Sequence, residues 1–370
     1  MKMNNYYDNT LEWIEEITVS EKENLNFYKE FYSEETIHFP IPKGIDPPPW
    51  NSEYQFRKPF VAMINNGSVW AKNMEVVSIM TPNRKLLRDT THFSLWHNFN
   101  PEEAPPFAYY NGTVAVLAWA GANNYYHWLH DILSRIHLLE LSGIKVDKYL
   151  IPKLQLPFQI ETILRLAIPE NKIIEIDSHN FHLKAKNLVI TSIPTYLGAS
   201  TKWACDFIRK SFSNNKSIKR KGLYDKLYIS REDSKWRKVI NERDVTRALS
   251  VNGFKKVVLT PLSIEEQIDI FSSAKVIVSP YGANLTNLIF CEPGTKVIQL
   301  FTSPPHKLFS DNNFMSEYFR IGHYMGLDFN FMNCRIARPS PNKPLFNNLF
   351  VDIKKLLRFL DKINQSTNLD

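Results

Sequence analysis

Two histidines, an aspartate and an arginine lie within one otherwise apolar stretch, NNYYHWLHDILSRI at residues 123–136. At 3.6 residues per turn, His127, Asp131 and Arg135 are spaced four apart on one side of a helix, opposite an apolar stripe. A histidine titrates near neutral pH, and a carboxylate one turn away orients it or acts as the base itself. The alternative is an ordinary (i, i+4) contact on a helix surface.

Two arginines follow a predicted strand in YISREDSKWRKVINERD, residues 228–244. Arg231 comes just past the strand, Arg237 is six residues later, and Asn241 opens a helix. Guanidinium groups in this position bind phosphate oxygens in a bidentate way that lysine does not. The alternative is that both arginines form surface ion pairs with the neighbouring acids Glu232, Asp233 and Glu242.

A third stretch, SPYGANLTN at residues 279–287, leaves a strand, turns through a proline and a glycine, and enters a helix. Glycine lets the backbone approach a ligand closely, and the start of a helix offers N–H donors to a diphosphate. The alternative is an ordinary strand-to-helix turn. The predicted ligand contacts are Tyr281, Gly282, Ala283 and Asn284.

Strands and helices alternate along most of the chain. After an antiparallel element at 74–80, we predict strands at 114–120, 148–151, 172–176 and 187–191, and helices from about 124, at 159–167 and at 203–212. The pattern restarts with strands at 226–230, 255–259, 275–279 and 296–301, and helices at 241–253, 263–274 and 348–363. Such alternation predicts an α/β fold with parallel sheets, in which ligands bind at the carboxyl ends of the strands.

A chain of 370 residues exceeds the size at which one core usually splits, so two domains are expected. We predict a first domain over 1–212, a linker over 213–222, a second domain over 223–345, and a C-terminal helix and tail over 346–370. Three widely spaced cysteines have no metal-ligand spacing, and no apolar run reaches about 18 residues. These features predict a cytoplasmic protein without a bound metal.

Basic residues concentrate between residues 209 and 238, where eleven Lys or Arg face three acids. Such a patch predicts an anionic partner: a nucleotide diphosphate, a lipid headgroup or a nucleic acid. The segment lacks the interleaved glycines and aromatics of an RNA-binding motif, so a nucleic-acid-binding protein is the disfavoured alternative.

Taken together, the three stretches resemble glycosyltransferase family 61. The similar elements occur in the family's order: NYYHWLHDILSRIHLL (124–139), YISREDSKWRKVINERDV (228–245) and the segment from LSIEEQ to KVIQL (262–300). The stretch at 68–87 resembles the family's N-terminal β region. The similarity thus spans roughly residues 68–302.

The resemblance implies a GT-B architecture, with two Rossmann-like doubly wound domains facing across a cleft. It implies sugar transfer with inversion from a nucleotide-sugar donor, expected to be UDP-linked, to a glycan or lipid-linked acceptor in surface polysaccharide biosynthesis. No metal is implied, and the chain has no Asp-x-Asp motif. Arg231 and Arg237 match the family's arginines and would bind the leaving diphosphate, and either His127 or Asp131 would be the base. Peripheral contact with an anionic membrane face is compatible with the basic patch.

Two positions depart from the family pattern, and both fall in the expected donor site. Tyr281 stands where the family's turn has histidine, and a phenol carries no positive charge near pH 7. Gln299 stands where the last strand usually has glutamate, and its carbonyl is the weaker acceptor for ribose hydroxyls. These departures leave open a catalytically silent relative that binds a nucleotide sugar or glycan.

Overall fold

The computed structural model describes residues 5–20, 27–41, 43–44, 53–72, 76–96, 99–196, 199–213, 224–302, 317–338 and 346–365. The chain divides into two compact units, which are not simple halves. Unit 1 comprises residues 1–35, 55–196 and 206–211, and unit 2 comprises 36–54, 197–205 and 212–370. The predicted domain limits stay predictions, and most of the predicted linker, from residue 214 on, lies outside the described residues.

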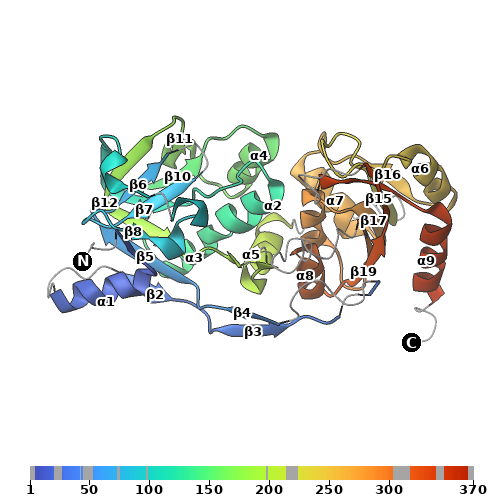
Figure 1. The fold of residues 1–370 in the computed structure, drawn as a ribbon, viewed down its shortest axis with the longest axis horizontal. Coiled ribbons are helices and arrows are strands. Elements are labelled where there is room, and N and C mark those ends of the chain that lie inside the picture. Colours follow the sequence, from blue (N-terminus) through green and yellow to red (C-terminus); the bar gives the residue numbers. More distant parts are fainter. Residues whose placement is uncertain are drawn as a thin grey trace. The chain divides into compact units, whose positions relative to one another are not determined.

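Unit 1 is built on a ten-stranded mixed sheet (Figure 1). Its main path runs β1 (Tyr6–Tyr7), β8 (Leu86–Leu87), β7 (Val77–Met80), β6 (Ser68–Ala71), β12 (Phe181–Thr191), β9 (Ala108–Val116), β10 (Lys148–Pro152) and β11 (Ile173–Ile176). Off this path, β5 (Phe60–Asn65) pairs with β12 and with β2 (Tyr28–Glu30). The last four strands of the path pair in parallel, whereas β5, β6 and β7 pair antiparallel, as expected for the N-terminal element.

The helical segments of unit 1 follow the parallel strands. They are α2 (Tyr125–His127), the π-helix η4 (Trp128–Leu133), α3 (Arg135–Ser142) and α4 (Pro157–Arg165), while α1 (Thr10–Ser20) lies near the N-terminus and α5 (Lys202–Phe212) is divided between the units. Short 3₁₀ turns occur at Arg88–Thr90, Phe93–Leu95, Pro101–Glu103 and Glu170–Lys172. Trp13 of α1 joins strand residues such as Ile64, Val114 and Leu188 in one apolar core.

Unit 2 contains a five-stranded, wholly parallel sheet. Its strand order is β16 (Lys255–Val257), β15 (Lys226–Ile229), β17 (Val276–Pro280), β18 (Lys296–Phe301) and β19 (Asp328–Asn333). The first strand in sequence, β15, therefore lies between the second and the third. This order reverses the direction of winding between β15 and β17, and in open α/β sheets ligands bind at such a switch point.

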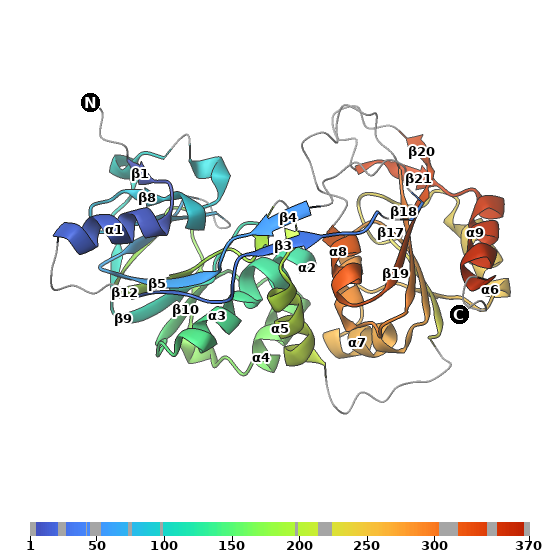
Figure 2. The ribbon, with the colours of Figure 1, turned by 90° about the horizontal axis from the view of Figure 1, so that it is seen from below.

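Helices cover both faces of this sheet (Figures 1 and 2). One face carries α6 (Glu242–Val251) and α9 (Ile353–Gln365), and the other carries α7 (Ile264–Ser273), α8 (Glu317–Tyr324) and the 3₁₀ helix η6 (Ala283–Phe290). Strand residues Tyr228, Val278 and Ile298 share a core with α6 and α9. A capping box formed by Ser263 and Glu266 starts α7.

Three pairs of short strands complete the fold: β3 (Glu35–His38) with β4 (Glu53–Phe56), β13 (Thr195–Tyr196) with β14 (Ala199–Ser200), and β20 (Arg335–Arg338) with β21 (Asn348–Phe350). The segment after β3 packs on α8 and β19. The ring of Phe39 lies 5.2 Å from that of His323, and the backbone N–H of Phe331 donates to the carbonyl of Lys43 at 2.8 Å. Residues 36–54 thus belong to unit 2, although they precede most strands of unit 1.

The structure is mixed α/β, as predicted, and most predicted elements are found within a few residues of their expected limits. The first residues of the helix predicted over 348–363 form the strand β21 instead, and α9 begins at Ile353. The segment after β17 is helical, as predicted, and is a 3₁₀ helix that begins at Ala283. From Leu285 to Phe290 all its residues are buried between α7 and α8. The strand β9 ends at Val116 and starts earlier than expected.

Candidate functional site

The two predicted donor-binding segments lie together in unit 2, at the switch point of its sheet. Arg231 follows β15 by two residues, and Tyr281 and Gly282 directly follow β17, which is paired with β15. Because the strands are parallel, both segments emerge at the same carboxyl edge. The strand order that joins them was not predicted from the sequence.

The guanidinium of Arg231 rests against Gly282. A Cβ atom placed on Gly282 would lie 1.8 Å from Nη1 of Arg231, so any larger residue would displace this group. Among the described residues, Arg231 donates long hydrogen bonds of 3.4 Å to Oδ1 of Asn284 and to the carbonyl of Trp236. Burial, and then the positive charge of Arg237, lower the pKa of Arg231 to about 10. In the part of the chain that the structure describes, no carboxylate lies at hydrogen-bond distance from this cation.

Arg237 is the second cation of this group. Its Cζ lies 4.6 Å from the centre of the Tyr281 ring and 5.6 Å from that of Phe346, so its charge rests on two aromatic faces. Among the described residues its buried Nε has no hydrogen-bond partner. Arg237 also has a φ of 60°, which costs a side-chain-bearing residue about 1 kcal/mol. Backbone conformations of this kind cluster at active and ligand-binding sites.

The remaining predicted donor residues differ in their contacts. Ala283 opens η6, next to Asn284, whose Nδ2 donates to Ser279 Oγ at 3.3 Å. Gln299 is fully buried beside Ser279 in the sheet register, and neither polar atom of its amide has a partner among the described residues. Asn241 is engaged elsewhere: its amide exchanges hydrogen bonds of 2.8 and 3.0 Å with the backbone of Val351.

In unit 1, the structure brings His127 and Asp131 into direct contact. Nδ1 of His127 lies 2.7 Å from Oδ2 of Asp131, and the hydroxyl of Thr195 donates to Oδ1 at 2.5 Å. The side chain of Asp131 is 1% exposed and that of His127 is 39% exposed. The His127 ring packs on Gly121, where a Cβ would lie 3.0 Å from Cδ2. The carboxylate therefore orients an imidazole that solvent reaches.

The sequence predicts that His127, Asp131 and Arg135 form one polar side of a helix, opposite its buried apolar stripe. This prediction was wrong for two of them, because Asp131 and Arg135 are both buried. Arg135 donates from Nε to Thr191 Oγ1 at 2.7 Å and from Nη1 to the carbonyl of Leu117 at 3.2 Å. Burial lowers the pKa of Arg135 to about 10. This residue fastens the helix to the sheet and is not available to a ligand.

The helix also widens into a π-helix at Trp128–Leu133. The backbone N–H of Ser134 bonds the carbonyl of Leu129, five residues back, at 3.1 Å. The Ser134 hydroxyl instead donates to the carbonyl of His130 at 2.5 Å, which is the acceptor an α-helix would give to the backbone. Single π turns occur often at functional sites.

Three residues near these groups were not predicted. Burial and the nearby His127 lower the pKa of His92, while Asp131 opposes that shift. The ring of His92 lies 5.6 Å from that of Trp119. Thr195 follows the carboxyl end of β12, a position that the rule for parallel strands could have identified. Glu317, which accepts from the Tyr281 hydroxyl at 2.5 Å, opens α8, a helix we did not predict.

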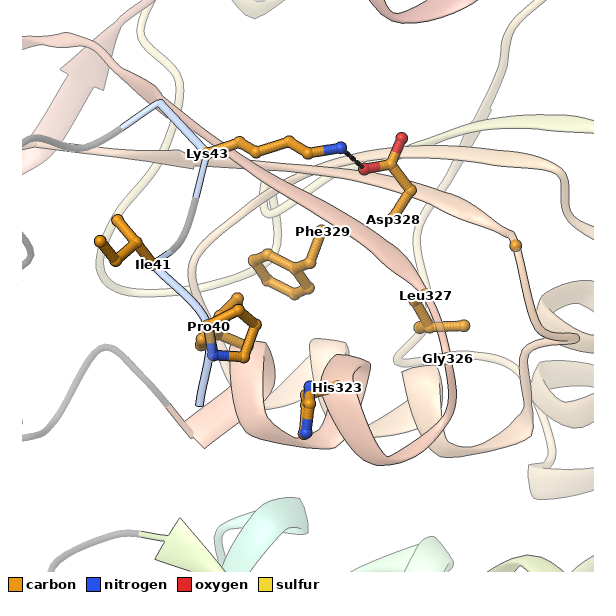
Figure 3. Close-up of a pocket in the computed structure, with 10 residues that line it drawn as sticks. Pro40, Ile41, Lys43, His323, Gly326, Leu327, Asp328 and Phe329 are labelled. Carbon is orange, nitrogen blue, oxygen red and sulfur yellow. Dashed lines mark hydrogen bonds and ion pairs between the residues drawn. The ribbon is translucent and has the colours of Figure 1, made fainter. Parts of the chain in front are cut away.

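A separate cavity of about 390 Å³ lies between Pro40, Ile41 and Lys43 and the α8–β19 region (Figure 3). Lys43 and Asp328 form a 2.8 Å ion pair at this cavity and so neutralise each other. None of the predicted site residues lines it.

The part of the chain that the structure describes holds no group of three or more His, Cys, Asp or Glu residues able to bind a metal ion. Its helices are all too short or too polar to cross a bilayer.

The fold is mixed α/β, and two arginines lie beside a glycine turn at the switch point of the unit 2 sheet. The family model described as Glycosyltransferase 61 matches residues 125–298, somewhat under half of the chain, and confirms the resemblance to that family. The match begins in α2 and ends in β18, so it includes His127, Asp131, both arginines and the glycine turn. No curated protein matches the chain significantly.

Proposed function

We propose that this protein is an inverting, metal-independent glycosyltransferase of GT-B architecture. It would transfer a sugar from a nucleotide-sugar donor, UDP-linked, to a hydroxyl of a glycan or lipid-linked acceptor in surface polysaccharide biosynthesis. The family match supports glycosyltransferase activity. The observation that carries the rest is the pair of arginines, Arg231 and Arg237, beside Gly282 at the switch point of the unit 2 sheet.

The donor's diphosphate would bind at this edge of the sheet. Arg231 would exchange its 3.4 Å contacts for shorter charge-assisted bonds to phosphate oxygens, and Nε of Arg237 would gain the partner it lacks among the described residues. Backbone N–H groups at the start of η6 would add donors. Positive charge fixed in this way stabilises the leaving diphosphate, the role that a divalent ion has in other transferases.

The base in this proposal is His127. Both carboxylate oxygens of Asp131 already accept hydrogen bonds, and the group is buried, so Asp131 would orient the ring and stabilise its protonated form. With the Nδ1 proton directed to Asp131, the lone pair is on Nε2. The acceptor hydroxyl would give its proton to Nε2 while its oxygen attacks the anomeric carbon, and the diphosphate would leave with the electrons of the broken bond.

Location and partners complete the proposal. We expect the enzyme to act in the cytoplasm, with basic residues of the 209–238 segment in contact with an anionic membrane face that carries the acceptor. The catalytically silent relative remains the second reading because Tyr281 and Gln299 depart from the family pattern. Neither residue supplies a positive or negative charge to the donor site.

A transfer assay separates these readings. The purified protein is incubated with a panel of nucleotide sugars, with glycan and lipid-linked acceptors, and with or without a chelator. We expect turnover with at least one donor, insensitivity to the chelator, and a loss of nucleotide affinity of about 1 to 3 kcal/mol in Arg231→Ala. Nucleotide-sugar binding with no hydrolysis or transfer would favour the silent relative, and activity abolished by the chelator would contradict the metal-independent proposal.

A further inference from the structure

We infer that Glu317 is a positioning residue of the donor site, which holds Tyr281 beneath Arg237 and sets the net charge that this group presents to a diphosphate. The inference rests on the proposed function, because it assigns a role within the same donor site.

The contacts form a chain from the carboxylate to the cation. Glu317 is 7% exposed at the first position of α8. Its Oε1 accepts a hydrogen bond of 2.5 Å from the Tyr281 hydroxyl. The Tyr281 ring is itself the surface on which the Arg237 guanidinium rests, 4.6 Å from the ring centre. Tyr318 lies against the same ring at 5.4 Å.

These contacts give Tyr281 a different role from that of a cationic side chain at the same position. A neutral tyrosine cannot bind phosphate by charge, but its face can hold a guanidinium that does. The ring serves this purpose only if it stays in place, and the bond to Glu317 anchors its far end. Arg237, with its φ of 60° and its unpartnered Nε among the described residues, depends on such support.

The ionisation of Glu317 then matters for anion binding. Burial raises the pKa of Glu317 to about 7, although the Tyr281 hydroxyl and the nearby cations oppose the shift. When this carboxyl is protonated, the arginines keep their full charge for a diphosphate. When it is ionised, it neutralises part of that charge, so donor affinity falls as pH rises through about 7.

Among the described residues near Glu317, the other groups with shifted pKa values do not account for a change of charge in this range. Tyr281 and Tyr318 have pKa values raised by burial, Arg231 has its pKa lowered only to about 10, and the pKa of His323 is lowered by burial. Among the elements packed on α8, β19 contributes Asp328, which is paired with Lys43, and the described parts of β14 and η6 contribute no charged side chain. In the described part of the chain, the cations that act on this carboxyl are Arg320 and Arg237.

Calorimetric titration with UDP-glucose tests this role, since its diphosphate keeps the same charge between about pH 6.5 and pH 8.5. We expect wild-type affinity to fall about tenfold across that range, and Glu317→Gln, which still accepts the tyrosine hydroxyl, to bind tightly without pH dependence. Glu317→Ala and Tyr281→Phe should weaken binding about tenfold at about pH 6.5. Tyr228→Phe is the matched control, because it removes a similar 2.8 Å bond from a buried tyrosine to Glu242 and should bind like the wild type.

Two outcomes overturn the inference, and they are distinguishable from failure of the proposed function. If Arg231→Ala weakens binding as expected while Tyr281→Phe binds like the wild type, the donor site stands and the anchoring role is wrong. If Glu317→Gln keeps the wild-type pH dependence, the charge role is wrong. A wild-type protein that binds no nucleotide sugar at any pH overturns both the proposed function and this inference. Glu317→Gln keeps the test valid should Glu317→Ala fail to fold.

Discussion

At the scale of single residues, Gly282 is the position where the absence of a side chain matters most. Its space is occupied by the end of Arg231, and its φ of 168° is extended backbone that other residues adopt without strain. A methyl group at this position would therefore act by moving the guanidinium and leave the backbone conformation unchanged.

We predict that Gly282→Ala weakens nucleotide diphosphate binding about tenfold or more, with little loss of stability. Calorimetry gives the affinity and thermal unfolding gives the stability. Gly143→Ala is the matched control, because Gly143 has a φ of 70° and open space around it. That variant should lose stability and keep its nucleotide affinity. Unchanged affinity in Gly282→Ala would remove Arg231 from the donor site.

The contact of His127 with Asp131 leads to a second prediction for single residues. His127→Ala should lower turnover about a hundredfold or more and leave donor affinity unchanged, because a base acts on the acceptor hydroxyl. Asp131→Asn should lower turnover less, since the amide keeps the ring in place without the charge. Steady-state rates and donor titrations separate the two effects.

His137→Gln provides the control for a histidine replaced in the same unit, since His137 contacts Tyr32 and Phe207. Its turnover should equal that of the wild type. Full turnover in His127→Ala would mean that another group takes the proton.

At the scale of elements, the π-helix η4 carries Asp131 and the buried His130, and it directly follows His127, the last residue of α2. His130 is fully buried, its ring lies 4.6 Å from that of Tyr126, and burial lowers its pKa to about 3. In the unfolded chain a histidine titrates near 6.5. Between these values the unfolded state binds the extra proton, so this residue costs stability progressively as pH falls below about 6.5.

We predict that replacing His130 by leucine removes this pH dependence. Below about pH 6 the free energy of unfolding of the wild type should fall more steeply than that of His130→Leu, by about 1.4 kcal/mol per pH unit. Urea unfolding at a series of pH values measures both slopes. Equal slopes would show that His130 is protonated in the folded protein.

Comparison of these elements with the sequence analysis shows which of them the sequence patterns predicted. The alternation from residue 226 to 301 predicted β15, α6, β16, α7, β17 and β18, because each element carries its own periodicity and breakers. The π-helix was not predictable in this way. The spacing of His127, Asp131 and Arg135 resembles one polar side of an α-helix, and only their partners on other strands show that two of them are buried.

At the scale of the whole molecule, the contacts that sequence patterns miss are those between distant segments. The backbone of Lys43 bonds that of Phe331, almost 290 residues later, and this places residues 36–54 in unit 2. Glu317 accepts a hydrogen bond from Tyr281, 36 residues earlier, and it lies at the start of α8, a helix that no sequence motif predicted. The candidate residues were predictable because motifs are local, whereas their neighbours Thr195, His92 and Glu317 come from tertiary packing.

The central claim is that Arg231 and Arg237 bind the diphosphate of a nucleotide beside Gly282. A crystal structure of the protein with UDP tests it most directly. We predict phosphate oxygens within hydrogen-bond distance of both guanidinium groups, at the carboxyl ends of β15 and β17. UDP bound elsewhere, with no phosphate oxygen near either arginine, would contradict the claim.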